Sequence, residues 1–246
     1  EPFDTLSAKH TTDLLGKNIC VFGDSLAASG NGGDDTWIQR VADYYQCANA
    51  YNRGIGSSCI TNKDKDNQDR VGYAYVDASG DAYNRGMYST QQTITGYTEI
   101  SPWMNGTDRA NTIPTDTDLV IILAGANDVS TTNESMFKTA YAQMLQNIMT
   151  RVPDAKIITC TFVYNHSYDS VPEVKAVYDR YRGYIKEVSA EFGFPCIDMM
   201  ANMGCNNYNY EAYMNADGVH FNTTAGRILT AECVAGFLRQ YAKILT

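Results

Sequence analysis

The sequence predicts an α/β fold in which a parallel sheet carries helices on both faces. Short apolar runs alternate about five times with segments of helical period, and the apolar runs end in polar turns, several of them rich in glycine. Continuous apolar runs are typical of strands covered on both faces. Alternation of strands and helices is typical of parallel sheets.

Five strands are predicted, and the first helix lies between the first two of them. The strands are expected at residues 18–22, 48–51, 119–123, 157–163 and 195–198. Thr36 is a suitable cap for the first helix, which places Trp37, Ile38 and Val41 on one apolar face.

Three further helices follow the third, fourth and fifth strands. A capping box from Thr131 to Glu134 predicts the start of one of them. A second capping box from Ser170 to Glu173, with proline at the first helical position, predicts the next. A closing helix is expected over residues 223–244.

Two parts of the chain show no regular period. Residues 1–16 are expected to form an N-terminal arm, and residues 60–115 an irregular insertion rich in tyrosine that also contains Trp103. Loops of this length in a compact domain are usually functional or decorated insertions. With no repeat or linker in view, we expect residues 1–246 to form a single domain.

Charge and hydropathy exclude several kinds of partner. The formal net charge is −9, without a lysine or arginine cluster, which argues against nucleic acid or an anionic membrane and favours a neutral substrate. No apolar run reaches the roughly 18 residues of a membrane span. The polar start is not a signal peptide, but a removed signal or a domain cut from a longer chain would look the same. The protein is expected to be soluble, and its compartment and oligomeric state stay open.

Cysteine and histidine usage gives no metal site. Seven cysteines are present, of which Cys47, Cys59, Cys205 and Cys233 lie outside the predicted strands and could pair in an oxidising compartment. There is no Cys-x-x-Cys pair, and none of the three histidines belongs to a ligand-like pair. We therefore expect neither a metal nor a cofactor.

Ser25 is the candidate nucleophile, because it follows the first strand in a Gly-Asp-Ser turn. Open α/β sheets place their ligands at the carboxyl ends of such strands. A serine hydroxyl needs a base, and the base needs a third group that orients it. His220 has Asp217 three residues earlier, a spacing that lets the carboxylate reach Nδ1 and leaves Nε2 for Ser25. His166 follows the fourth strand and is expected to border the pocket.

Acyl transfer also needs hydrogen-bond donors directed at the developing oxyanion. Candidates are the N–H of Ser25, an N–H from the Gly56-Ser57 turn and the side-chain amide of Asn127. All of these lie at predicted strand ends. Three separate loops are therefore expected to meet in one crevice.

Four blocks of sequence, at residues 23–26, 52–58, 125–128 and 217–220, resemble those of the SGNH, or GDSL-type, hydrolases. The resemblance implies a three-layer α/β/α flavodoxin-like sandwich and ester hydrolysis through an acyl-serine intermediate. It implies that Ser25 is the nucleophile, His220 the base, Asp217 its orienting group and Asn127 an oxyanion donor. Many members carry glycine where this chain has a serine after Gly56, so the choice of oxyanion N–H between these two residues stays open.

The resemblance covers lipases, thioesterases, arylesterases and carbohydrate acetylesterases. No long apolar stretch near the blocks suggests an acyl-chain tunnel, and the insertion offers aromatic faces that suit sugars. We therefore predict removal of small acyl groups, above all acetyl, from carbohydrate, with Asp24, His166 and Trp103 bordering the substrate. A lysophospholipase or acyl-thioesterase, and a non-catalytic carbohydrate-binding module, remain the alternatives.

Overall fold

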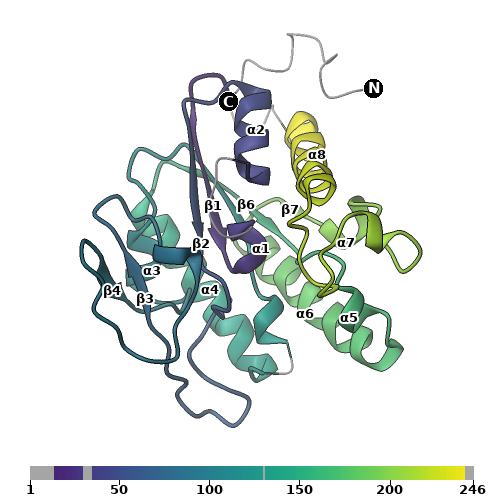
Figure 1. Cartoon of the computed structure of the whole chain (residues 1–246), viewed down its shortest axis with the longest axis horizontal. Helices are drawn as coiled ribbons and strands as arrows, with labels where there is room; N and C mark the ends of the chain where they lie inside the picture. Colours follow the sequence, from purple (N-terminus) through teal and green to yellow (C-terminus); the bar gives the residue numbers. More distant parts are fainter. Residues whose placement is uncertain (1–13, 30–34, 130, 242–246) are drawn as a thin grey trace.

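A sheet of five parallel strands lies at the centre of the structure, a computed structural model that describes residues 14–29, 35–129 and 131–241 (Figure 1). The strands are β1 (Asn18–Gly23), β2 (Asn49–Gly54), β5 (Leu119–Leu123), β6 (Lys156–Cys160) and β7 (Cys196–Ile197). They lie in the order β2-β1-β5-β6-β7, and each pair is parallel. Counted along the chain, this is the 2-1-3-4-5 order of flavodoxin-like sheets. The predicted fold class is confirmed.

Helices cover both faces of this sheet, because successive strand residues point to opposite sides. On β1, Ile19 and Val21 belong to one apolar cluster, whereas Cys20 and Phe22 belong to the other. The first cluster includes residues of α2 (Trp37–Tyr45), α7 (Met199–Asn202) and α8 (Thr224–Tyr241). The second includes residues of α3 (Thr107–Asn111), α4 (Glu134–Arg151) and α6 (Pro172–Glu191). Figure 1 shows α2 beside α8 and α4 beside α6, as the outer layers of the sandwich.

The predicted strands are all present; β5 has the predicted bounds, and the ends of the other four differ. The second continues to Gly54, through residues that were expected to form a turn. The fourth ends at Cys160 rather than at Val163. Thr36 caps α2 as predicted, because its Oγ1 accepts a hydrogen bond from the N–H of Gln39 at 3.2 Å.

Both predicted capping boxes are wrong. The helix α4 begins at Glu134 itself, and its cap is the side chain of Asn133. The hydroxyl of Thr131 is not available for capping, because it donates to a backbone carbonyl in the preceding turn. The helix α6 begins with the proline expected there, but its cap position is Val171, one residue after Ser170, and no side chain caps it.

The insertion at residues 60–115 is more ordered than predicted. It contains an antiparallel pair, β3 (Ala74–Val76) and β4 (Thr98–Ile100), the 3₁₀ turn η3 (Tyr83–Arg85) and the helix α3. Its tyrosines pack on one another, as in the edge-on contact of Tyr75 with Tyr88 at 5.8 Å between ring centroids. These rings stabilise the insertion itself.

Two glycines allow close backbone contacts, one between β1 and β5 and the other between β2 and the segment after β1. A Cβ on Gly23 would lie 1.9 Å from the carbonyl oxygen of Leu123 in β5. A Cβ on Gly54 would lie 2.2 Å from the backbone nitrogen of Ala28. No side chain fits at either position, and the close packing fixes the residues that follow Gly23.

Several predictions fall partly outside the described residues. Of the predicted arm at residues 1–16, the structure describes only residues 14–16, where Leu14 is buried. The predicted end of the closing helix beyond residue 241 also lies outside them. Within the described part of the chain, no helix is long and apolar enough to cross a membrane.

All seven cysteines are free thiols, so the four that were open to pairing are not paired. Burial raises the pKa of Cys47 and Cys59 to about 12 and that of Cys205 and Cys233 to about 11. Among the described residues, no group of three or more His, Cys, Asp and Glu side chains is placed to hold a metal ion.

Candidate active site

Ser25 is the first residue of α1 (Ser25–Ala28), the short helix that follows β1. Asp24 caps this helix, because its Oδ1 accepts a hydrogen bond from the N–H of Leu26 at 2.9 Å. The strand β1 lies between β2 and β5, so Ser25 follows the strand at which the order of the sheet reverses. Open α/β sheets bind their ligands at this reversal, outside the carboxyl ends of the strands.

His220 connects Ser25 to Asp217 through two hydrogen bonds. Its Nε2 lies 2.8 Å from Oγ of Ser25, and its Nδ1 lies 2.8 Å from Oδ2 of Asp217. The other carboxylate oxygen, Oδ1, accepts hydrogen bonds from the N–H groups of Val219 at 2.8 Å and His220 at 3.0 Å. The carboxylate therefore bends back over its own loop, as the three-residue spacing predicts. This is the geometry in which a histidine can take a proton from a serine hydroxyl.

The loop that carries Asp217 is held by hydrogen bonds to both oxygens of the carboxylate and to its backbone carbonyl. Partial burial raises the pKa of Asp217, but the hydrogen bonds from His220 and Val219 outweigh it and keep this pKa below its ordinary value. Ser167 supports the same loop from outside, because its hydroxyl donates to the carbonyl of Asp217 at 2.8 Å. Gly218 adopts a left-handed φ of +66°, which glycine tolerates best. Asp217 is thus kept ionised and oriented.

The turn after β2 presents two backbone N–H groups near Ser25. The N–H of Gly56 donates to the carbonyl of Arg85 at 2.6 Å and is already used. The N–H of Ser57 donates to no described residue, and Ser57 adopts a left-handed φ of +63°. A Cβ on Gly56 would lie 3.2 Å from the Arg85 carbonyl oxygen and 3.7 Å from Cβ of Ser25, so a side chain would be tightly confined there. The geometry favours Ser57 as the free donor.

Asn127 contributes a side-chain amide to the same place. It lies in the 3₁₀ turn η4 (Ala126–Asp128), directly after β5. Its Nδ2 donates one hydrogen to the carbonyl of Ser58 at 2.9 Å. An amide nitrogen carries two hydrogens, so one remains for a ligand. The groups predicted from three separate loops are therefore brought together.

Three residues expected to border the substrate lie elsewhere. The Asp24 carboxylate is fully buried, and its Oδ2 has no hydrogen-bond partner. The ring of His166 stacks on Tyr210, with 3.5 Å between centroids, outside the groove that Ser25 lines. Trp103 is 8% exposed and packs within the insertion, near Gly72. None of these three residues lines the groove of Ser25, which corrects the predicted substrate contacts.

Asp128 ties the loop after β5 to the segment after β2. Its two oxygens accept hydrogen bonds from the N–H of Ile60 at 3.1 and 2.9 Å, and its Oδ1 accepts another from the hydroxyl of Thr132 at 3.1 Å. Burial raises the pKa of Asp128 to about 7 and that of Asp24 to about 6. The loop that carries Asn127 is therefore anchored by a buried carboxyl group whose pKa is raised by burial.

Replacing Asp128 with asparagine should change how stability depends on pH. A carboxyl group with a raised pKa binds its proton more tightly in the folded chain, so its contribution to the free energy of unfolding falls as pH rises from about 4 to about 7. Asp128→Asn removes this contribution. We expect the variant to gain stability relative to wild type between pH 4.5 and pH 7.5, measured by urea unfolding. A constant difference across this range would show that Asp128 does not titrate in it.

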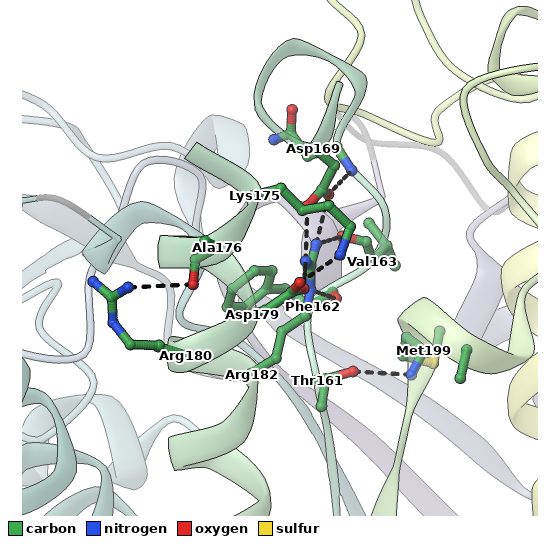
Figure 2. A network of polar contacts seen from close by, with 12 residues as sticks. Thr161, Phe162, Val163, Asp169, Lys175, Ala176, Asp179, Arg180, Arg182 and Met199 are labelled. Carbon is green, nitrogen blue, oxygen red and sulfur yellow. Dashed lines mark hydrogen bonds and ion pairs between the residues drawn. The ribbon is translucent and has the colours of Figure 1, made fainter. Parts of the chain in front are cut away.

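A buried ion pair holds the segment that supports the Asp217 loop. This segment is α5 (His166–Asp169), and Asp169 forms two hydrogen bonds with Arg182 of α6, at 2.8 and 2.7 Å (Figure 2). The guanidinium also donates to the carbonyls of Phe162 at 3.2 Å and Val163 at 2.9 Å. Asp169 and Arg182 have side chains that are 0% and 4% exposed. The pair fixes α5 against α6 and the end of β6.

Breaking this pair should destabilise the fold. Asp169→Asn leaves a buried guanidinium without its main counter-charge, and we expect the free energy of unfolding to fall by about 3 kcal/mol. Asp179→Asn is the matched control, because Asp179 also pairs with Arg182 but is 44% exposed. Its loss should cost less than about 1 kcal/mol. Equal effects in urea unfolding would contradict the assignment of Asp169 as the main partner.

Ser25 and His220 open into a groove of about 500 Å³. Its walls come from the turn after β2, residues 85–87 of the insertion, the loop after β5, and the start of α5 and α6. Tyr168 lies on Tyr178 with 5.0 Å between ring centroids and 17° between planes, and both line the groove. The groove thus combines the reactive groups with an aromatic wall.

The chain is similar in sequence to one protein family and in fold to several solved structures. A model of the GDSL-like Lipase/Acylhydrolase family matches residues 21–228. Among solved structures, a lipase/acylhydrolase from Enterococcus faecalis is 17% identical, covering 91% of this chain and 96% of its own, with a TM-score of 0.56. An acetyl xylan esterase is 15% identical, covering 90% and 99%, with a TM-score of 0.57. A variant acetyl xylan esterase from Geobacillus stearothermophilus is 16% identical, covering 92% and 94%, with a TM-score of 0.56. At these identities the structures share the fold alone. No curated protein matches the sequence.

Proposed function

This chain belongs to the GDSL-like lipase/acylhydrolase family, and we propose that it is a serine esterase that removes small acyl groups, acetyl above all, from carbohydrate. The observation that carries the proposal is the unbroken series of hydrogen bonds from Asp217 through His220 to Ser25, at the edge of an open groove. A serine hydrolase of the Ser-His-Asp type uses these three groups in this arrangement.

In the proposed reaction, Ser25 Oγ attacks the ester carbonyl while His220 Nε2 accepts its proton. The negative charge that develops on the carbonyl oxygen is met by the N–H groups of Ser25 and Ser57 and by the amide of Asn127. Removing one such donor typically raises the barrier by roughly 3 kcal/mol. His220 then gives the proton to the departing alcohol, and water attacks the acyl-serine with His220 again as base. Asp217 holds the ring so that Nε2 faces Ser25 throughout.

Carbohydrate is proposed as the alcohol because of the aromatic wall of the groove. Tyr168 is 43% exposed and offers a ring face and a hydroxyl, which are the features that bind sugar rings. Two of the solved structures with this fold are acetyl xylan esterases, which is consistent with the proposal. The groove is lined by polar and small residues as well as by Leu26 and Met87, and this mixture suits a short acyl group.

The test is the acyl-chain preference of the folded protein. We expect p-nitrophenyl acetate to be hydrolysed with a higher kcat/KM than the butyrate, and the octanoate to be the poorest substrate. In a second assay, we expect the protein to release acetate from acetylated oligosaccharides. A preference for octanoate would favour the lysophospholipase or acyl-thioesterase alternative. No hydrolysis of any ester, together with binding of glycans, would favour the carbohydrate-binding alternative.

A further inference from the structure

Arg85 lines the groove beside Ser25, although it comes from the tyrosine-rich insertion. Its backbone carbonyl accepts the N–H of Gly56, and the next segment pairs back, because the N–H of Met87 donates to the carbonyl of Gly56 at 3.0 Å. A Cβ on Gly56 would contact both Arg85 and Ser25 within 4 Å. The turn that carries Arg85 is therefore fixed next to the nucleophile.

The guanidinium of Arg85 has no partner of opposite charge among the described residues. Its Nη1 is buried and makes no hydrogen bond. The nearby carboxylate, Asp81, is paired with Arg53 instead, and Arg53 also donates to the carbonyl of Thr112 at 2.7 Å. Arg85 is only partly buried, and its Nε and Nη2 donate to no described residue, so these two donors are free to bind an anion.

The charge of the groove differs from that of the chain. The chain has 28 acidic and 19 basic residues. Among the described residues that line the groove, Arg85 is the only Asp, Glu, Lys or Arg. Burial lowers the pKa of Arg85 while the charge of Asp81 opposes this shift, and a guanidinium stays protonated at any physiological pH. A substrate in the groove thus meets one fixed positive charge.

We propose that Arg85 binds a carboxylate on the alcohol part of the substrate, so that the preferred substrate is an O-acetylated acidic sugar. The inference rests on the proposed esterase function and refines its substrate. The carboxylate is placed on the sugar because the proposed acyl group, acetyl, consists only of a methyl group and the ester carbonyl and carries no carboxylate. The net charge of the sequence favoured a neutral substrate, but a local charge at the site decides recognition.

The experiment compares two acetylated sugars that differ only in charge. The substrates are an O-acetylated methyl galacturonoside with a free carboxylate and its carboxamide. For wild type we expect the acid to be favoured by about tenfold in kcat/KM, mainly through KM, which is the effect of one charge-assisted hydrogen bond. The preference should weaken with added salt. The preference for the acid should disappear in Arg85→Gln and be partly retained in Arg85→Lys. For each variant, the ratio of kcat/KM for the acid to kcat/KM for the carboxamide is measured on that same variant.

The outcomes separate this inference from the esterase proposal. If wild type hydrolyses p-nitrophenyl acetate and both sugars with a ratio near one, the inference is wrong while the esterase proposal stands. If Arg85→Gln keeps the preference for the acid, Arg85 is not the anion site. The inference would also be contradicted if the protein preferred p-nitrophenyl hemisuccinate to the butyrate but hydrolysed the two sugars equally well. In that case the carboxylate that Arg85 binds would lie on the acyl group. If wild type hydrolyses no ester at all, the esterase proposal itself fails.

Discussion

Ser25→Ala should reduce kcat for p-nitrophenyl acetate by about 10⁶-fold, the scale of losing the nucleophile in a serine hydrolase. The remaining groups, including the N–H of Ser57 and the amide of Asn127, would still polarise a bound ester, so a small rate above that in water is expected. The variant should fold normally, because the hydroxyl of Ser25 has one hydrogen bond, to His220. The measurement is single-substrate kinetics with circular dichroism on the same sample.

Ser89→Ala provides the control for this variant. Ser89 is an exposed serine of the insertion and does not line the groove, so its loss should leave kcat within twofold of wild type, roughly the scatter of a neutral surface change. If Ser25→Ala were folded and retained more than about one per cent of the wild-type rate, its hydroxyl would not be the nucleophile, because covalent catalysis has no substitute for it.

Asp217→Asn should reduce kcat by about 10⁴-fold, as expected when a triad histidine is held in the wrong tautomer. The asparagine oxygen would keep accepting the N–H groups of Val219 and His220, which leaves its NH₂ group facing Nδ1. Nδ1 must then act as acceptor, and the ring proton moves to Nε2, where it blocks proton transfer from Ser25. KM should change little.

The matched control for the second variant is Asp154→Asn, which makes the same change at an exposed aspartate far from His220 in the sequence. It should retain full activity. A folded Asp217→Asn variant with the wild-type kcat would remove Asp217 from the mechanism and leave its role to the loop conformation alone.

The strands and the contact between Asp217 and His220 were predictable because their signals are local. Residues 119–123 form a continuous apolar run, and β5 has these same bounds. Asp217 and His220 lie three residues apart, and this short spacing fixes their contact. The carboxyl ends of parallel strands meet at one edge, so the strand predictions also placed Ser25 near Asn127.

The oxyanion turn and the substrate wall depend on distant parts of the chain. The N–H of Gly56 is occupied because the carbonyl of Arg85, about thirty positions further along the sequence, accepts it; this is why we propose Ser57 as the oxyanion donor. Nothing local marks that contact. Aromatic content likewise suggested Trp103 for the substrate, but the structure buries it and brings Tyr168 to the groove.

The support of the site was missed for a similar reason. Asp169 and Arg182 are thirteen positions apart, in two helices whose relative placement the sequence does not state. The one signal that was available is Arg182, a charged residue among the buried apolar residues of α6. Ser167, which holds the loop of Asp217, has no distinguishing neighbour at all.

The most direct test of the central claim is covalent labelling with a fluorophosphonate, followed by mass spectrometry of the peptides. In this reaction the serine oxygen displaces fluoride at phosphorus, and the histidine takes the serine proton. The account predicts one phosphonyl group per chain, on Ser25, and almost none in a folded His220→Ala variant. Labelling at another residue, or no labelling of the folded wild-type protein, would contradict the claim that His220 activates Ser25.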